Sequence, residues 1–418
     1  MKHFLFLLLI CCPSAALAWN LSDHRDISKL SLQDVSAEWG LNKPVAVRPL
    51  DSLLEKIRPL RPEIADRWHF SHYLQVNPKI DLGHAESHLL PQVPLKERKE
   101  MTPLEILGYY STDPDDGRDQ DLFVRDEKGT PQYAYPDQKW FGFARGSNSQ
   151  AFRHIEKPPF RLDHPVATFG FPLRKLGEAS RRAEIYHRMS LLAFALGEDY
   201  WGWRFLANAF HYLEDLHQPY HAGQIPPSLM KKGIAALSWG RKDLGFIGTF
   251  AHIVSNSHRF FESYVEKPPK DSLEEKASAF KALGGQDLIS YRGSFESLAV
   301  DVRDASNLVY GRLAEDVSTI ADPRLAGSYE FRSDEKSQDD PAQFVNEGPD
   351  FAAADRDLFS IVAERFASAG RILRTAVHAI LSEKEAGKEA KEDPKSLLSA
   401  LDGLLGPSPF QQESEENP

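Results

Sequence analysis

One stretch near the middle of the chain predicts a helix that carries metal-ligating side chains: Phe210-His211-Tyr212-Leu213-Glu214-Asp215-Leu216-His217-Gln218-Pro219-Tyr220-His221. His211 and Asp215 are one helical turn apart, so their side chains project from the same face and can reach one cation at about 2.0–2.2 Å. His221 follows a proline that ends or bends the helix, and it can point into the same cavity from another direction. The alternative is that His211 is hydrogen-bonded in the core and Asp215 is solvated. Considered alone, His217 is predicted to be exposed or to support the ligands.

A second pair with the same spacing, His258 and Glu262, lies in another strongly helical stretch. Either pair alone is readily explained without a metal, in this case as a surface pair. Two such pairs on neighbouring helices indicate a metal cluster. His252 competes with His258, but no carboxylate lies four residues beyond it. We therefore interpret His252 as a histidine of the core or one that supports the ligands.

Apolar residues at three- and four-residue spacing predict the helices around these pairs. The predicted helices cover residues 51–64, 181–196, 199–216, 247–265, 298–320 and 355–381. Gly197 is predicted to end the helix that precedes residue 199. Strand signals are sparse, so the sequence predicts an all-α fold. Between residues 112 and 172 the composition shifts to Asp, Gly, Pro and aromatic residues, which predicts long loops over the helical body.

Residues 1–18 have the pattern of a cleaved signal peptide. A basic residue precedes an apolar run, and Ala16-Leu17-Ala18 supplies the small residues that precede a cleavage site. The apolar run is shorter than the about 20 residues that span a bilayer, so we expect an exported protein, periplasmic or secreted, after cleavage following Ala18. A lipoprotein anchored through Cys11 or Cys12 is the alternative, which the bulky residues before them disfavour.

The positions of the cysteines and the net charge of the chain limit which metal ligands and which substrates the sequence allows. The two cysteines both lie in residues 1–18, so the processed chain would hold any metal with His, Asp, Glu or backbone groups. The formal net charge of −11 at pH 7 argues against a basic face for non-specific binding to duplex nucleic acid. It does not exclude a nuclease, because a local metal charge can hold a phosphodiester.

Signal cleavage would leave Trp19 as the first residue, with His24 shortly after it. An α-amino group has an unperturbed pKa of about 7.7–8.0, so it can lose its proton and bind a metal together with the Trp19 carbonyl. His24 could bind alongside. Without a metal, the same segment predicts a helix N-terminus capped by Ser22 or Asp23.

In combination, these elements resemble the zinc-dependent phospholipase C family, which shares its fold with the fungal-type single-strand nucleases. The family signature is a mature N-terminal Trp, an early His, a His-x-x-x-Asp-x-x-x-x-x-His run and a later His-x-x-x-Glu or His-x-x-x-Asp, and all four occur here in order. The resemblance covers mainly residues 19–28 and 105–265. It implies one mainly helical domain, residues 19–382, whose long loops surround a cleft with three zinc ions. Residues 29–107 form an insertion that the resemblance leaves unassigned, and we expect a mobile loop at 328–349. Residues 383–418 are expected to be a disordered tail, apart from a short helix that residues 397–405 could form.

The resemblance also implies a ligand set. Trp19 and His24 would bind the first zinc ion, and Asp215 would bridge it to a second ion that also takes His211. The third ion would take His221, His258 and Glu262.

The family supplies one further Asp and one further His to the second zinc ion from loops before the central helices. Phe152-Arg153-His154 is similar to the histidine element, and residues 113–117 are similar to the carboxylate element. We select His154 and Asp115, with Asp116 and Asp119 as the nearest alternatives. Without the resemblance, the Asp/Gly run predicts turns or an incomplete calcium loop.

The activity implied by the resemblance is hydrolysis of a phosphodiester by a zinc-activated water, with Asp115 as proton acceptor or orienting group. His258-Arg259-Phe260-Phe261-Glu262 lacks the Trp-Asp pair usual in the nuclease branch. We therefore expect a phospholipid substrate and transient contact with a membrane surface, and we keep single-stranded nucleic acid as the alternative substrate. The aromatic residues Trp140, Phe141 and Phe143 could lie at a lipid interface, stack on bases or fill the core.

A third hypothesis is an exported protein that binds zinc without catalysis. It would be favoured if Asp115 or His154 did not reach the metal cleft, because the second zinc ion would then lack ligands. We expect no stable protein partner in any of the three cases.

Overall fold

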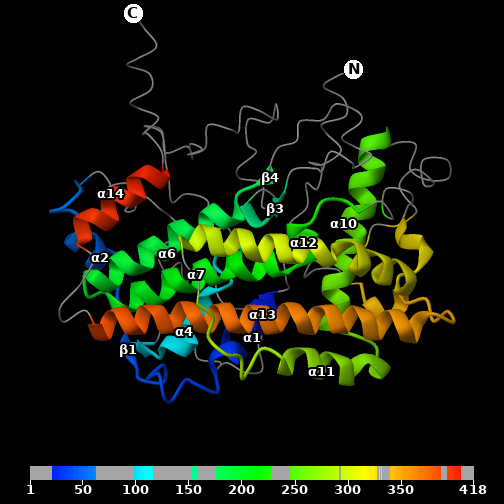
Figure 1. Cartoon of the computed structure of the whole chain (residues 1–418), viewed down its shortest axis with the longest axis horizontal. Coiled ribbons are helices and arrows are strands. Elements are labelled where there is room, and N and C mark those ends of the chain that lie inside the picture. Colours follow the sequence, from blue (N-terminus) through cyan, green and yellow to red (C-terminus); the bar gives the residue numbers. More distant parts are fainter. Residues whose placement is uncertain are drawn as a thin grey trace, which may run out of the picture.

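The described part of the chain is built mainly of helices, which confirms the all-α class (Figure 1). The computed structural model describes residues 21–62, 98–115, 153–158, 176–226, 229, 245–290, 293–326, 329, 331, 339–386 and 393–405. Within these ranges, strands are limited to two short antiparallel pairs. β1 (Val45–Ala46) pairs with β2 (Glu100–Met101), and β3 (Glu156–Lys157) pairs with β4 (Leu176–Gly177).

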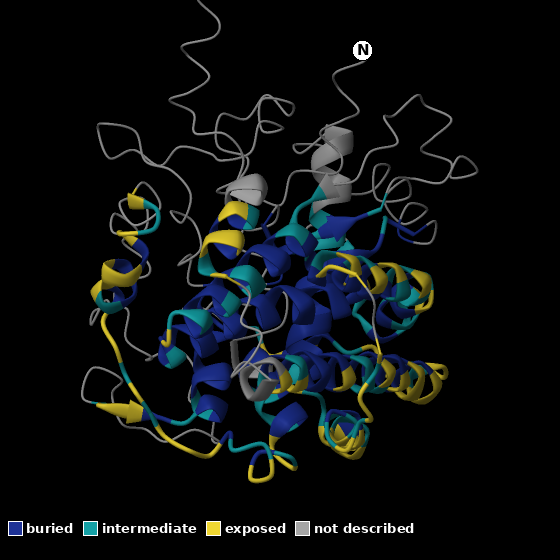
Figure 2. Cartoon of the chain, turned by 60° about the vertical axis from the view of Figure 1, so that its left-hand side comes forward, coloured by how far each residue is buried: buried dark blue, intermediate teal, exposed yellow. Residues whose placement is uncertain are grey.

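The central element is α7 (Asp199–His217), which is buried from Tyr200 to His217. It contacts α1 (Leu21–Leu32), α4 (Pro103–Tyr110), α6 (Ala179–Ala195), α8 (Pro219–Ala222), α12 (Phe295–Ile320) and α13 (Phe351–Ala386). Figure 2 shows the buried interior, with exposed residues on the outer faces of the surrounding helices. Because its neighbours enclose α7, its polar side chains lie in the interior and must find partners there.

The predicted helices correspond to observed ones, although the helix predicted at residues 51–64 ends at Ile57. They are α2 (Leu50–Ile57), α6, α7, α10 (Gly245–Glu266), α12 and α13. Gly197 lies between α6 and α7 with a φ of +72°, the left-handed conformation that commonly ends a helix. Pro219 begins the separate helix α8, so His221 lies beyond the bend as predicted. Shorter elements complete the described part: η7 (Lys270–Ser272), α11 (Leu273–Lys281), η8 (Pro323–Ala326) and η9 (Pro341–Phe344).

Part of the expected mobile loop, residues 328–349, is packed on the helical body. Phe344 in η9 and Phe331 are both buried, with ring centroids 5.4 Å apart. Phe331 in turn packs against Phe260 of α10 at 5.9 Å. Because these aromatic rings are removed from water, the expectation of a mobile excursion is corrected for this part of the segment.

The short helix considered for residues 397–405 is present within the expected tail, residues 383–418. Residues 394–405 form α14 (Pro394–Leu405), which packs on α6. Leu397, Leu398 and Leu401 are buried in this contact. The helix begins three residues earlier than expected, and residues 387–392 and 406–418 lie outside the described residues.

At Gly370 the backbone of α13 lies close to the backbone of Leu283. A Cβ atom added there would overlap the backbone oxygen of Leu283, just after α11. We expect Gly370→Ala to destabilise the protein by about 1–3 kcal/mol despite the higher helix propensity of alanine. Gly311→Ala in α12 is the matched control, because nothing lies within 4 Å of a Cβ added there, and it should stabilise by up to about 1 kcal/mol. Urea unfolding of both variants measures the difference, and equal midpoints would contradict it.

His187 on α6 should make the protein sensitive to acid. Its ring stacks on Phe295 at a centroid distance of 4.2 Å, and burial lowers its pKa to about 4. Unfolded chains bind this proton below about pH 6.5, so the free energy of unfolding should fall by about 3 kcal/mol between pH 6.5 and 4. His187→Phe should flatten the pH dependence in this window, and His378→Phe at an exposed position of α13 should not. Urea unfolding at several pH values tests this, and parallel curves for parent and His187→Phe would refute it.

Candidate metal centre

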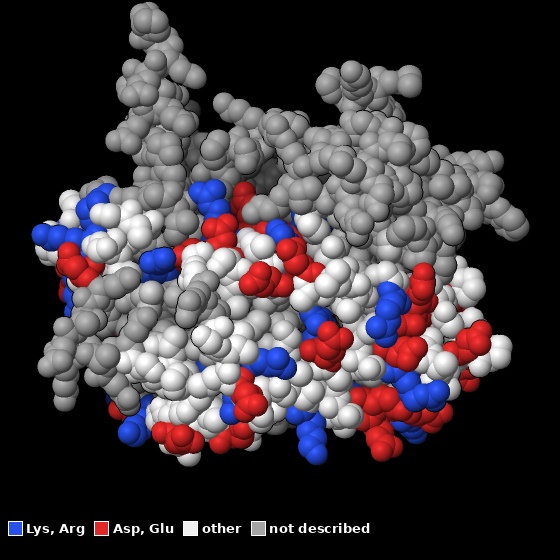
Figure 3. Space-filling view, viewed as in Figure 1, with Lys and Arg blue, Asp and Glu red and all other residues white. Residues whose placement is uncertain are grey.

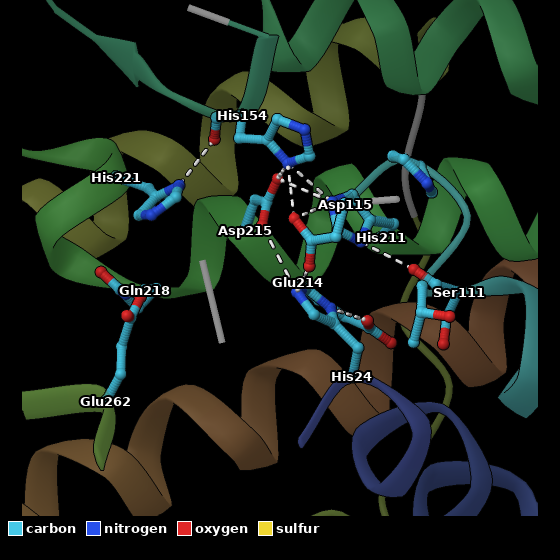
Figure 4. A network of polar contacts seen from close by, with 12 residues as sticks. His24, Ser111, Asp115, His154, His211, Glu214, Asp215, Gln218, His221 and Glu262 are labelled. Atoms are coloured by element: carbon cyan, nitrogen blue, oxygen red, sulfur yellow. Dashed lines mark hydrogen bonds and ion pairs between the residues drawn. The ribbon is translucent and has the colours of Figure 1, made fainter. Parts of the chain in front are cut away.

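The predicted ligands that fall within the described ranges gather in one buried region (Figure 4). They are His24, Asp115, His154, His211, Asp215, His221, His258 and Glu262. These residues come from α1, the turn after α4, the helical residues just before β3, and helices α7, α8 and α10. The expected signal segment, Trp19, the alternatives Asp116 and Asp119, and the aromatic residues 140, 141 and 143 lie outside the described residues.

The first group of ligand atoms lies between α1 and α7. His24 Nε2 is 3.7 Å from Asp115 Oδ2 and 3.6 Å from Asp215 Oδ1. In a tetrahedral zinc site with ligands at about 2.0–2.2 Å, neighbouring ligand atoms are roughly 3.3–3.6 Å apart. The three side chains are therefore spaced to share one ion.

The second group adjoins the first. His154 Nδ1 is 2.7 Å from His211 Nε2, 3.0 Å from Asp215 Oδ2 and 3.5 Å from Asp115 Oδ1. His211 Nε2 is 3.3 Å from Asp215 Oδ2 and 3.8 Å from Asp115 Oδ1. Asp115 and Asp215 thus each direct one oxygen to the first group and the other oxygen to the second. The expectation that Asp115 serves the second site alone is corrected, because its carboxylate faces both.

The third group lies between α8 and α10. His258 Nε2 is 2.7 Å from Glu262 Oε1 and 3.1 Å from His221 Nε2. Gln218 also reaches this group, because its Nε2 is 2.7 Å from His258 Nε2 and donates to Glu262 Oε1 at 2.9 Å. Gln218 was not among the predicted ligands, because its only signal in the sequence is its position between the helix end and Pro219.

Two of the histidines have their tautomers fixed by backbone acceptors. His211 Nδ1 is 2.7 Å from the carbonyl oxygen of Ser111, and His221 Nδ1 is 2.8 Å from that of His154. A carbonyl oxygen can only accept, so Nδ1 carries the hydrogen in both rings. The Nε2 lone pairs of His211 and His221 therefore face the ligand groups, which is the arrangement of metal-bound histidines.

Burial also favours the metal-binding form of the histidines. It is the main cause that lowers the pKa of His24, His154 and His258 well below the ordinary value, and neighbouring imidazoles lower it further. Burial brings the pKa of His221 to about 3. Neutral imidazole is the form that binds metals, so these rings need not lose a proton at neutral pH.

Glu214 is a further residue of the centre that the sequence analysis did not select. Its carboxylate is buried between α7 and α1, where Oε2 is 2.6 Å from His24 Nδ1. Burial is the largest cause that raises the pKa of Glu214 well above its ordinary value, and Asp215 and Asp115 raise it further. Hydrogen-bond donors or nearby cations are therefore needed to hold it in the charged form.

The two remaining histidines near these helices lie outside the ligand groups. His217 was predicted to be exposed or to support the ligands, but it is 1% exposed and faces α13. Its Nδ1 is 2.7 Å from the Leu213 carbonyl oxygen, and its Nε2 is 3.2 Å from Ser368 Oγ. The prediction of exposure is wrong because α13 covers this side of α7. His252 is partly buried, with its Nε2 3.2 Å from Asn256 Nδ2.

Within the described ranges, no helix combines the length and apolarity needed to cross a membrane. Comparison of the chain with protein-family models, curated proteins and solved structures finds no match in any of the three. The described residues do, however, contain three groups of buried His, Asp and Glu side chains that could hold metal ions.

Proposed function

We propose that the protein is an exported zinc-dependent phosphoric diester hydrolase of the phospholipase C type. The observation that carries the proposal is the position of Asp115 and Asp215, each of which faces two neighbouring groups of imidazole nitrogens. Two carboxylates shared in this way suit a pair of divalent cations. Such pairs are used to hydrolyse phosphodiesters, because both the attacking and the leaving oxygen need stabilisation.

The donor set supports zinc as the metal. It consists of imidazole nitrogens and carboxylate oxygens, which suit zinc in tetrahedral sites with an open position. His24 Nε2 is buried and has no hydrogen-bond partner, although buried polar atoms are normally satisfied. A cation between this nitrogen and the two aspartates would satisfy it. Three ions would occupy the three groups, with Trp19 completing the first.

Bound zinc would lower the pKa of a coordinated water toward about 7 and offset charge on the phosphate. The total positive charge of three divalent cations would exceed the total negative charge of the buried carboxylates, which are Asp115, Asp215, Glu214 and Glu262. The centre would then carry a positive surplus in a buried environment, which favours an anionic phosphodiester.

Asp115 is the proposed proton acceptor. Its carboxylate is fully buried, as is that of Asp215. Asp115 lies in the turn after α4, whereas Asp215 lies within α7. The two oxygens of Asp115 face both ligand groups, so one can accept a proton while the other stays directed at the metal site.

A phospholipid is the preferred substrate class, and single-stranded nucleic acid is the alternative. The preference is supported by the pattern from His258 to Glu262, which lacks the Trp-Asp pair of the nuclease branch. Acidic and basic side chains are intermixed on the described face shown in Figure 3, which does not resemble an extended cationic track for a nucleic-acid strand.

The test is the zinc content of the protein that begins at Trp19, measured together with hydrolysis of phosphatidylcholine and single-stranded DNA with and without chelator. About three zinc ions and chelator-sensitive lipid cleavage are expected, with activity restored by zinc. Cleavage of DNA alone would assign the nuclease activity instead. One ion or none, with neither substrate cut, would overturn the enzyme proposal and leave a zinc-binding protein.

A further inference from the structure

We propose that Glu214 is a positioning residue that holds His24 in the tautomer needed to bind the first metal ion. The inference rests on the proposed metal centre and extends it, because Glu214 has no place in the ligand set expected from the sequence. It concerns the juxtaposition of a buried carboxylate on α7 with two side chains on α1.

The carboxylate of Glu214 contacts two side chains that lie one turn apart on α1. Its Oε2 is 2.6 Å from His24 Nδ1, and its Oε1 accepts a hydrogen bond of 2.7 Å from Ser28 Oγ. All three residues are fully buried. Figure 4 shows His24 on α1 with its ring between Glu214 on one side and the ligand groups on the other.

This contact decides which nitrogen of His24 carries the hydrogen. On its far side the ring faces Asp115 Oδ2 and Asp215 Oδ1, which are also acceptors. In the absence of an acceptor at Nδ1, those two carboxylates would favour the tautomer with hydrogen on Nε2, which cannot bind a metal through that atom. Glu214 provides the competing acceptor, so the hydrogen lies on Nδ1 and the Nε2 lone pair points at the first site.

The acceptor at His24 Nδ1 differs from the acceptors of the other two histidines whose tautomers are fixed. Backbone carbonyl oxygens accept from His211 and His221. At the corresponding atom of His24 the acceptor is the carboxylate of Glu214, and His24 Nε2 has no hydrogen-bond partner. A negatively charged acceptor also makes the ring a more basic ligand, which strengthens its bond to a cation.

The test combines zinc titration with the histidine tautomer in the metal-free protein. Glu214→Ala should weaken binding of one ion by about 10–100-fold and leave the other two unchanged. Long-range proton–nitrogen correlation spectra of histidine-labelled protein should show His24 moving from the Nδ1–H to the Nε2–H tautomer, with His24→Gln identifying its signals. Glu214→Gln keeps an acceptor oxygen, so it should retain the Nδ1–H tautomer and lose less affinity.

Asp355→Asn is the matched control. Asp355 is another buried carboxylate, which accepts a hydrogen bond of 2.6 Å from the Tyr264 hydroxyl, and it contacts none of the ligand groups. This variant should lose stability while binding zinc like the parent. Parent-like zinc affinity and an unchanged His24 tautomer in Glu214→Ala would overturn the inference. If Glu214→Ala does not fold, Glu214→Gln decides. A smaller loss of zinc affinity with the Nδ1–H tautomer of His24 retained is expected, and parent-like zinc affinity would overturn the inference.

The outcomes also separate this inference from the proposed function. A parent protein that binds three ions but hydrolyses no phosphodiester would remove the function and leave the role of Glu214 intact. A parent protein that hydrolyses a phosphodiester, with unchanged zinc affinity of the first site in Glu214→Ala, would support the function and overturn the role of Glu214. A parent that binds no zinc would overturn both.

Discussion

Replacing Asp215 with asparagine should remove two metal ions at once and nearly abolish hydrolysis. The two oxygens of Asp215 lie 3.6 Å from His24 Nε2 and 3.0 Å from His154 Nδ1, in two different ligand groups. Asparagine has nearly the same shape but lacks the charge and has only one oxygen to offer. We expect kcat/KM to fall by at least about 10²–10³-fold, the effect of losing one preorganised electrostatic contact in a buried site.

The comparison with Glu262→Gln makes this prediction specific. Glu262 belongs to the third group alone, through its contact with His258, so its replacement should cost one ion. Zinc analysis should therefore give about one remaining ion in Asp215→Asn and about two in Glu262→Gln. Loss of a single ion in both variants would show that Asp215 does not serve two sites.

The helices and the paired ligands were predictable because both are local properties of the sequence. Apolar periodicity fixes which residues of α7 and α10 face the interior. A separation of four residues puts His211 with Asp215, and His258 with Glu262, on one face of a helix regardless of the rest of the fold. The position of His221 followed from the proline before it.

Two ligands of the second group were harder to predict from the sequence. Asp115 and His154 are 39 residues apart and lie outside the long helices, and no periodicity relates them to α7. They were selected only through the resemblance to the phospholipase C family. The structure brings both to within 3.8 Å of His211 Nε2, so the condition that would have favoured a non-catalytic protein is not met.

Glu214 and Gln218 were missed because their roles depend on the packing of distant segments. Glu214 contacts His24 across 190 residues, so its function depends on where α1 lies along α7. Gln218 acts at His258 and Glu262, which depends on the approach of α10 to the end of α7. In the sequence, both residues read as ordinary polar positions of a helix.

The C-terminal helix α14 was indicated by the same local periodicity. Average composition from residue 383 onward is charged and polar, which is typical of disorder. Within it, Leu397, Leu398 and Leu401 form a short apolar stripe that packs on α6. A residue-by-residue periodicity indicates a helix of this length, which the average composition of the tail does not show.

Removal of the metal ions should lower the thermal stability of the protein sharply. Without cations, the carboxylates of Asp115, Asp215 and Glu214 are packed together in the interior. An ion present at 100 times its dissociation constant stabilises the folded state by about 2.7 kcal/mol, so three ions should contribute several kcal/mol. For a protein of this size we expect chelation to lower the melting temperature by about 10 °C or more.

Circular dichroism melts at fixed pH, with chelator and after zinc is restored, measure this effect. The shift should be mostly lost in Asp215→Asn, because that variant already lacks two of the ions. It should persist in Asp355→Asn, which lowers the melting temperature without touching the ligand groups. If chelation strips the zinc and leaves the melting temperature of the parent unchanged, the buried carboxylates do not depend on metal ions. The stripped zinc would then have been bound elsewhere, and the three groups would be a hydrogen-bonded core and not a metal centre.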